Sequence, residues 1–305
     1  MTTEDTFGLA GFQVGRIGYG TLRLTGNGML GNSDGPPVAR DRAVAVLRRA
    51  VELGVRHIDT ASFYFSATRS ANELVNRALS PYPDDLLLAT KVGPKRAVSG
   101  EWLPPASPGE LRGQVEENLR QLGLDDLGLV NFRVVRQDSI AEHVGALAEL
   151  RAAGLVRHIG LSNVTPAQFA EATAVTDVVC VQNRYGLEHR VDEDNGLLAA
   201  CARRGIAYVP FFAVSGDRLE ASGASAPAPA VTAVARTRGA TAAQVRLAWT
   251  LHRGPHVLAI PGTSDPRHLE ENVAAGSLRL TDDELASLEQ RSTDRERAGG
   301  GPEEG

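Results

Sequence analysis

The chain has 305 residues, 42% of them hydrophobic, and its net charge at pH 7 is −5, from 32 basic and 37 acidic side chains. This length and composition suffice for one large apolar core. The acidic excess excludes an obvious nucleic-acid or anionic-membrane partner. No apolar run is long enough for a membrane span, and residues 1–15 lack the features of a secretory signal. Cys180 and Cys201 show no motif spacing, so we expect reduced, buried thiols and a cytoplasmic location.

Eight short apolar runs alternate with segments of helical periodicity. Each run is too uniformly apolar for a sheet with one solvent-exposed face, which is typical of buried parallel strands. We expect strands at residues 14–20, 55–61, 86–92, 127–133, 156–162, 178–183, 206–212 and 256–262. Eight strand–helix repeats predict an α/β protein with the (β/α)8 TIM barrel fold. A Rossmann domain is disfavoured, because no G-x-G-x-x-G follows a strand and opens a helix.

Helix starts between these strands carry capping signals, in which a hydroxyl residue precedes Glu or Gln by three positions. They are Ser70 with Glu73, Ser107 with Glu110, Thr165 with Gln168, and Thr241 with Gln244. We expect residues 1–294 to form a single barrel domain. Residues 215–229, rich in Gly, Ala, Ser and Pro, are predicted to form a mobile loop after the seventh strand, and the tail 295–305 to be disordered.

Three residues near the ends of two predicted strands point to proton transfer. Asp59 closes the second strand, Tyr64 follows it by five residues, and Lys91 closes the third. The carboxyl ends of barrel strands form the active face, so these side chains are expected to converge. A phenol is a weak acid, and a neighbouring ammonium would help it to donate a proton. An alternative is that Asp59 and Lys91 form a purely structural ion pair, although burying such a pair is costly.

At this point the chain resembles the aldo-keto reductases, whose catalytic tetrad is Asp, Tyr, Lys and His. Asp59, Tyr64 and Lys91 match three members, and the histidine position reads Arg133 in the segment FRVV. The resemblance covers nearly the whole chain, from GYGTLRL to IPGTS and EEN. It implies a small-molecule carbonyl substrate, NADPH as cofactor and a (β/α)8 barrel.

The resemblance also implies a set of cofactor-binding residues. In the family a Ser-Asn pair and a Gln hold the nicotinamide carboxamide, and an aromatic residue after strand seven stacks on the ring. The adenosine phosphate site follows strand eight, where hydroxyls and a cation suit a 2′-phosphate. NADPH is favoured over NADH, although Asp265 adds a negative charge and Gly262 stands where the family often has a lysine. The matching residues here are Ser162, Asn163, Gln182 and Phe211 for the nicotinamide, and Thr263, Ser264, Arg267, His268, Glu271 and Asn272 for the phosphate.

Arg133 widens the choice of substrate. A neutral histidine polarises a carbonyl, whereas arginine is always charged and can bind an anionic substituent through several N–H donors of its planar guanidinium group. The alternative is a scaffold residue that points away from the site. Together with GYG, WLP and HIGLSNVTP, Arg133 resembles a bacterial subgroup that includes pyridoxal reductases. Trp102 and Tyr185 are predicted to line the substrate pocket, unless they belong to the core.

The leading hypothesis is therefore an NADPH-dependent reductase of an aldehyde or ketone, with Tyr64 as the acid. One alternative is reduction of an imine or activated C=C bond. Another is a cofactor-binding regulatory subunit with little turnover. The histidines show no ligand spacing, so no metal site is predicted. The sequence does not identify the natural substrate or the oligomeric state.

Overall fold

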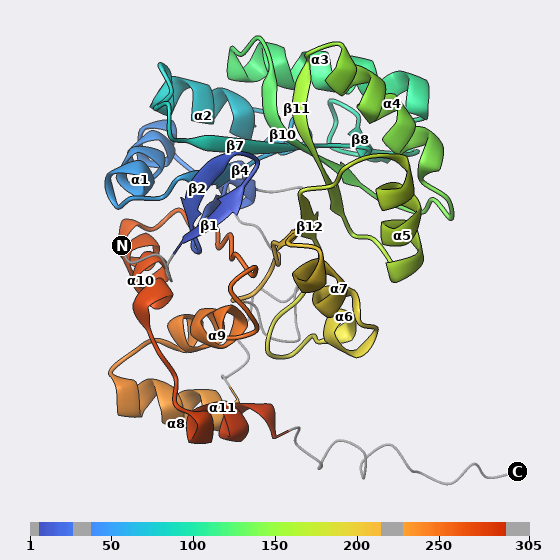
Figure 1. Cartoon of the computed structure of the whole chain (residues 1–305). Helices are drawn as coiled ribbons and strands as arrows, with labels where there is room; N and C mark the ends of the chain where they lie inside the picture. Colours follow the sequence, from blue (N-terminus) through green and yellow to red (C-terminus); the bar gives the residue numbers. More distant parts are fainter. Residues whose placement is uncertain (1–5, 27–37, 215–227, 291–305) are drawn as a thin grey trace, which may run out of the picture.

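The computed structural model describes residues 6–26, 38–214 and 228–290. Its centre is a seven-stranded, wholly parallel sheet that curls into a barrel, with helices around the outside (Figure 1). Residues 215–227 of the predicted loop and the predicted tail 295–305 lie outside the described residues. In sheet order the strands are β3 (Tyr19–Gly20), β4 (His57–Asp59), β7 (Leu87–Val92), β10 (Leu127–Arg133), β11 (Val156–Ser162), β12 (Cys180–Gln182) and β13 (Ala207–Tyr208).

The eighth predicted strand, residues 256–262, closes the barrel through single bridges and not through a regular strand. On the side of β13 the Leu258 N–H donates to the Tyr208 carbonyl oxygen at 2.9 Å. On the side of β3 the Gly18 N–H donates to the Ala259 carbonyl oxygen at 2.7 Å. This segment therefore joins the two edges of the sheet, and the predicted (β/α)8 class is confirmed.

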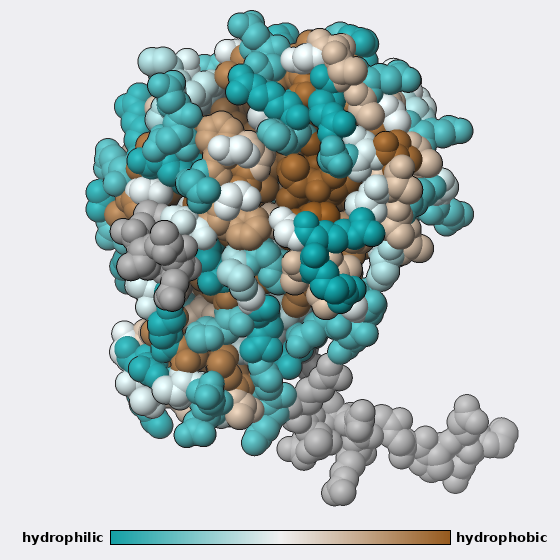
Figure 2. Space-filling view, viewed as in Figure 1, coloured by the Kyte–Doolittle hydropathy of each residue, from teal (hydrophilic) through white to brown (hydrophobic). Residues whose placement is uncertain are grey.

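The first predicted strand, residues 14–20, is divided between two elements. Its beginning belongs to an antiparallel hairpin of β1 (Thr6–Leu9) and β2 (Phe12–Gly15), and only its end forms β3. The hairpin covers the amino-terminal end of the barrel, where Leu9 and Val14 are buried. The surface on this side is largely hydrophilic, with apolar side chains visible beside the hairpin and over the C-terminal helices (Figure 2). The open end of the barrel is therefore the opposite one, where the parallel strands finish.

The helices follow the strands and pack around the barrel (Figure 1). The capping residues Ser70, Thr165 and Thr241 accept hydrogen bonds at the starts of α2, α5 and α9, as predicted. The helices are α1 (Arg40–Glu52), α2 (Ala71–Leu79), α3 (Leu111–Leu122), α4 (Ala141–Ala152), α5 (Pro166–Val175), α6 (Val191–Asp194), α7 (Leu197–Arg203), α8 (Pro229–Arg238), α9 (Ala242–Leu251), α10 (Pro266–Ala274) and α11 (Asp282–Glu289). Short 3₁₀ helices are η2 (Leu22–Leu24), η4 (Pro108–Glu110) and η5 (Ala275–Ser277).

Two of the buried apolar clusters position the barrel. The larger one fills the space between the strands and the surrounding helices. The smaller one fills the barrel interior above the hairpin and includes Leu87, Ala89, Leu129 and Val209. Burial of such side chains stabilises the fold by about 25 cal/mol per Å² of apolar surface. Beyond this inner layer, toward the carboxyl ends of the strands, the interior residues become polar, and the candidate site lies there.

Candidate active site

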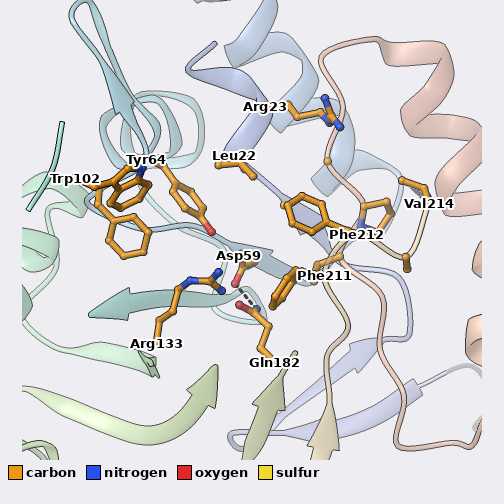
Figure 3. A pocket seen from close by; sticks show the side chains of 16 residues that line it. Leu22, Arg23, Asp59, Tyr64, Trp102, Arg133, Gln182, Phe211, Phe212 and Val214 are labelled. Carbon is orange, nitrogen blue, oxygen red and sulfur yellow. Dashed lines mark hydrogen bonds between the residues drawn. The ribbon is translucent and has the colours of Figure 1, made fainter. Parts of the chain in front are cut away.

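A cavity of about 170 Å³ opens where the parallel strands end. Its wall combines strand ends, the loop that carries Tyr64, the segment after β13 and the end of the eighth predicted strand (Figure 3). Of the predicted site residues it contains Asp59, Tyr64, Trp102, Arg133, Gln182 and Phe211. These residues come from well-separated parts of the sequence, so the barrel brings them together as the strand ends predicted.

Asp59 and Lys91 form a buried ion pair at the base of the cavity. Lys91 Nζ lies 2.5 Å from Asp59 Oδ2 and 3.2 Å from the carbonyl oxygen of Thr60. The second carboxylate oxygen of Asp59 accepts a bond of 2.8 Å from the amide of Gln182. Burial alone would lower the pKa of Lys91, but the charge of Asp59 and the nearby phenol outweigh it and raise that pKa. Lys91 is therefore a charged ammonium in this site.

Tyr64 stands over this ion pair. The Lys91 ammonium lies 4.9 Å from the centroid of the Tyr64 ring. The ring is buried and packs edge-on against Phe63, with centroids 5.1 Å apart. Its hydroxyl points into the cavity toward Asp59 and the guanidinium of Arg133 (Figure 3). The phenol is thus held where a bound carbonyl oxygen could reach it.

Arg133 ends β10 and turns its guanidinium into the same cavity (Figure 3). Its NH1 donates to Ser162 Oγ at 3.2 Å, and its guanidinium carbon lies 5.0 Å from the centroid of the Phe211 ring. Within the described residues this is the one hydrogen bond that its side chain donates, so most of its five donors are available to a ligand.

The residues predicted to hold the nicotinamide divide into two groups. Gln182, at the end of β12, and Phe211 line the cavity, whereas Ser162, at the end of β11, is buried beside it and accepts a hydrogen bond from Arg133. Asn163 follows Ser162 with a positive φ of 61°, is exposed, and donates its amide to the Val134 carbonyl oxygen at 3.0 Å. Asn163 therefore ties two strand ends together at the rim and does not line the cavity.

The predicted phosphate residues lie on the turn into α10 and on this helix itself. Thr263 and Asn272 are buried, while Arg267 and His268 are exposed on the first turn of the helix. Asp265 caps this helix by accepting the Arg267 N–H at 2.9 Å, and this bond lowers the pKa of its carboxyl group. The acidic residue therefore has a structural role at this turn.

Arg42 is a neighbour of this turn that the sequence did not indicate. It lies on α1, donates through Nε to the Ser264 carbonyl oxygen at 2.8 Å, and approaches Asp265 Oδ2 to 3.7 Å. Its charge compensates the negative charge of Asp265 beside the predicted 2′-phosphate position. Arg42 is one of several arginines in a helix far from the turn in sequence, so no sequence pattern distinguishes it from the others.

The two predicted substrate residues have different positions. Trp102, in β9 (Trp102–Leu103), lines the cavity. Tyr185 lies instead in the core, stacked on Trp249 with centroids 5.9 Å apart, and its hydroxyl donates to Glu193 Oε2 at 2.9 Å. The chain leaves β12 toward α6 and α9, which directs Tyr185 away from the cavity. We therefore do not retain Tyr185 as a substrate residue.

The structure adds cavity residues that the sequence analysis missed. Arg23 on η2 and Phe212 next to Phe211 both line the opening (Figure 3).

Among the described residues no group of three or more His, Cys, Asp or Glu side chains could hold a metal ion. No helix in the described part of the chain is both long and apolar enough to cross a membrane.

Comparison with known proteins agrees with this geometry. The sequence model of the Aldo/keto reductase family matches residues 16–292. A pyridoxine 4-dehydrogenase of Escherichia coli is 45% identical over 295 residues, which cover 94% of this chain and 98% of that protein. An uncharacterized oxidoreductase of Schizosaccharomyces pombe is 36% identical over 283 residues, covering 91% of this chain and 86% of its own.

Solved structures give the same assignment. An aldo-keto reductase from Klebsiella pneumoniae in complex with NADPH superposes with a TM-score of 0.78 at 27% identity, covering 96% of this chain and 98% of that one. The chain belongs to the aldo/keto reductase family, and the predicted family, barrel fold and oxidoreductase class are confirmed.

Proposed function

We propose that this protein reduces an aldehyde that carries an anionic group, such as pyridoxal, to the corresponding alcohol. The observation that carries the proposal is the convergence of Tyr64, the Asp59–Lys91 pair and Arg133 on one cavity. The 45% identity to a pyridoxine 4-dehydrogenase supports the substrate class. Small-molecule carbonyl substrates fit the family to which the chain belongs.

The cofactor is NADPH, as predicted, and the cavity fits its nicotinamide. Gln182 Oε1 is buried and accepts no hydrogen bond from the described residues, so it could accept one from a carboxamide N–H. Phe211 lines the same cavity with an aromatic face, and the buried Ser162 supplies a second polar group beside it, next to Arg133. We assign these three residues to the nicotinamide. When bound, NADPH supplies the hydride for carbonyl reduction.

Tyr64 supplies the proton in this proposal. Its hydroxyl donates to the substrate oxygen as negative charge develops there, and the resulting phenolate lies beside the Lys91 ammonium. Asp59 and the Thr60 carbonyl oxygen hold that ammonium in place. The pair is thus retained for function despite the cost of its burial.

Arg133 selects the substrate. A permanently charged fork can bind a phenolate or carboxylate next to the carbonyl with two parallel hydrogen bonds. The guanidinium group packs over the Phe211 ring and uses one N–H for Ser162, so its position is fixed while most of its donors remain available. We expect an aromatic aldehyde with an anionic neighbouring group to be preferred over a neutral one.

The adenosine end of NADPH is assigned to Thr263, Ser264, Arg267, His268, Glu271 and Asn272. Arg267 is exposed on the first turn of α10, where a helix amino terminus also favours a phosphate.

We further propose a cytoplasmic location, which the buried, unpaired thiols of Cys180 and Cys201 support.

The test follows the loss of the near-ultraviolet absorbance of NADPH with a panel of aldehydes, imines and activated alkenes. Turnover that is fastest with pyridoxal and other aldehydes bearing an anionic group supports the proposal. Turnover confined to imines or alkenes would replace it with the second hypothesis. Binding of NADPH without turnover on any compound would favour a regulatory subunit.

A further inference from the structure

Arg96 lies outside the cavity lining but contacts the backbone on both sides of Tyr64. It belongs to β8 (Lys95–Arg96), which pairs with β9 in a hairpin between β7 and α3. Its NH1 donates to the carbonyl oxygen of Phe63 at 3.2 Å and to that of Phe65 at 2.8 Å. One guanidinium nitrogen thus bridges the residues immediately before and after Tyr64.

The bridge completes the fixation of this loop. Between the two carbonyls that Arg96 holds, the Tyr64 carbonyl oxygen accepts the Ala71 N–H at 2.9 Å. Three successive carbonyl groups are therefore anchored by partners outside the loop, which leaves the backbone at Tyr64 little freedom. The Tyr64 N–H in turn donates to the Ala61 carbonyl oxygen at 3.1 Å.

The same guanidinium joins the loop to the wall of the cavity. Arg96 lies 4.7 Å from the centroid of the Phe65 ring and 5.2 Å from that of Trp102, and its Nε donates to the Gly100 carbonyl oxygen at 3.0 Å. Trp102 also packs edge-on against Phe63, with ring centroids 6.1 Å apart. Figure 3 shows Trp102 and Tyr64 on the same side of the cavity.

We propose that Arg96 is a positioning residue for Tyr64, which holds the phenol in line for proton transfer and couples its loop to the hairpin that carries Trp102. This inference rests on the proposed role of Tyr64 as proton donor. A displacement of about 1 Å of a reacting group can cost about 100-fold in rate. Cofactor binding should be unaffected, because the residues assigned to the nicotinamide and phosphate lie on other elements.

The test measures the rate of hydride transfer from bound NADPH to a saturating aldehyde in a single turnover. Arg96→Met should slow this step by about 10- to 100-fold and leave the Kd for NADPH unchanged. Arg96→Lys keeps the charge but cannot reproduce the guanidinium fork, so it should recover part of the rate. The matched control is Lys95→Met, since Lys95 is the neighbouring residue and its ammonium pairs with Glu110 at 2.6 Å, away from the Tyr64 loop.

A double-mutant cycle with Tyr64→Phe separates positioning from general support of the fold. If Arg96 acts through the phenol, Arg96→Met should have little further effect once the hydroxyl is absent. Equal slowing in both backgrounds, or an equal loss in the Lys95→Met control, would overturn the positioning role alone. A Tyr64→Phe variant as fast as the wild type would overturn both the proposed acid and this inference. If Arg96→Met does not fold, the same cycle is run with Arg96→Lys.

Discussion

The site has two regions of opposite character. At the base of the cavity the Asp59–Lys91 pair has side chains only 4% and 1% exposed, and Gln182 and Thr60 complete its hydrogen bonds. At the turn into α10 the Arg42–Asp265 pair has side chains 52% and 36% exposed, with 3.7 Å between the charged atoms. Buried charges interact strongly and depend on every partner, whereas exposed pairs contribute little to stability. We therefore expect the proposed proton-transfer region to be sensitive to single changes and the proposed phosphate turn, the turn into α10, to tolerate them.

The largest effect is expected at Tyr64. Tyr64→Phe removes only the hydroxyl that points into the cavity, so turnover should fall by about 10²- to 10⁴-fold, the range for a lost general acid. NADPH binding, measured by titration of the tryptophan fluorescence, should be retained because the assigned cofactor residues are untouched. Near-normal turnover under conditions where chemistry limits the rate would exclude Tyr64 as the proton donor.

Lys91→Met tests the contrast between buried and exposed charges directly. Removing the ammonium leaves the Asp59 carboxylate buried without its cation, which should lower the free energy of unfolding by about 3–5 kcal/mol. Arg42→Ala, the matched change at the exposed pair, should cost less than about 1 kcal/mol. Urea unfolding of both variants gives the comparison, and similar losses would show that burial does not distinguish the regions.

His57 adds a pH dependence to the buried region. It lies two residues before Asp59 in β4, is 1% exposed, and its ring nitrogens have no hydrogen-bond partner within the described residues. Burial lowers its pKa from 6.5 to about 4, the charge of Lys91 acts in the same direction, and that of Asp59 opposes it. Since the unfolded chain binds this proton more readily, stability is full above pH 6.5 and falls as the pH drops toward 4.

The expected loss from this single histidine is about 2 kcal/mol between about pH 7 and pH 5. His158, His252 and His256 also have lowered pKa values and contribute in the same direction. The difference between the wild type and His57→Leu isolates the one group, so urea unfolding should be compared for both proteins at each pH. Parallel pH profiles for the two proteins would mean that His57 is not held neutral in the fold.

The smallest effect is expected at the phosphate turn. Arg267→Ala removes one exposed cation, which should weaken NADPH binding by about 10-fold and leave NADH binding unchanged. Arg112→Ala on α3 is a suitable control, because Arg112 is similarly exposed and pairs only with Glu116 in the described structure. Equal effects on the two cofactors would remove Arg267 from the 2′-phosphate assignment.

The positions of Asp59 and Lys91 could be predicted from the sequence because the register of the parallel strands determines them. Asp59 pairs with Ala89 across β4 and β7, and Lys91 pairs with Asn131 across β7 and β10, so the ends of these strands meet at one edge. For a residue at the end of a parallel strand, the place in the sequence therefore predicts the place in the barrel. The same reasoning placed Arg133, which pairs with Ser162 across β10 and β11.

What the sequence did not predict depends on contacts made by loops and helices. Arg42 reaches a turn 222 positions later in the chain, and Arg96 reaches across a hairpin to the Tyr64 loop. Tyr185 stands three residues after Gln182, yet packing against Trp249 removes it from the cavity. No local pattern encodes these contacts, because they arise only when separate elements pack together.

Arg133 is proposed to select a carbonyl substrate with a neighbouring anion. The most direct measurement compares kcat/KM for pyridoxal and for benzaldehyde in the wild type, Arg133→Met and Arg133→His. A charge-assisted hydrogen bond contributes about 1.5–3 kcal/mol, so Arg133→Met should lose about 10- to 100-fold on pyridoxal and less on benzaldehyde. Arg133→His should shift the preference toward benzaldehyde, since a neutral donor replaces a permanent charge. An identical loss on both substrates would contradict this selective role and would mean that Arg133 only polarises the carbonyl group.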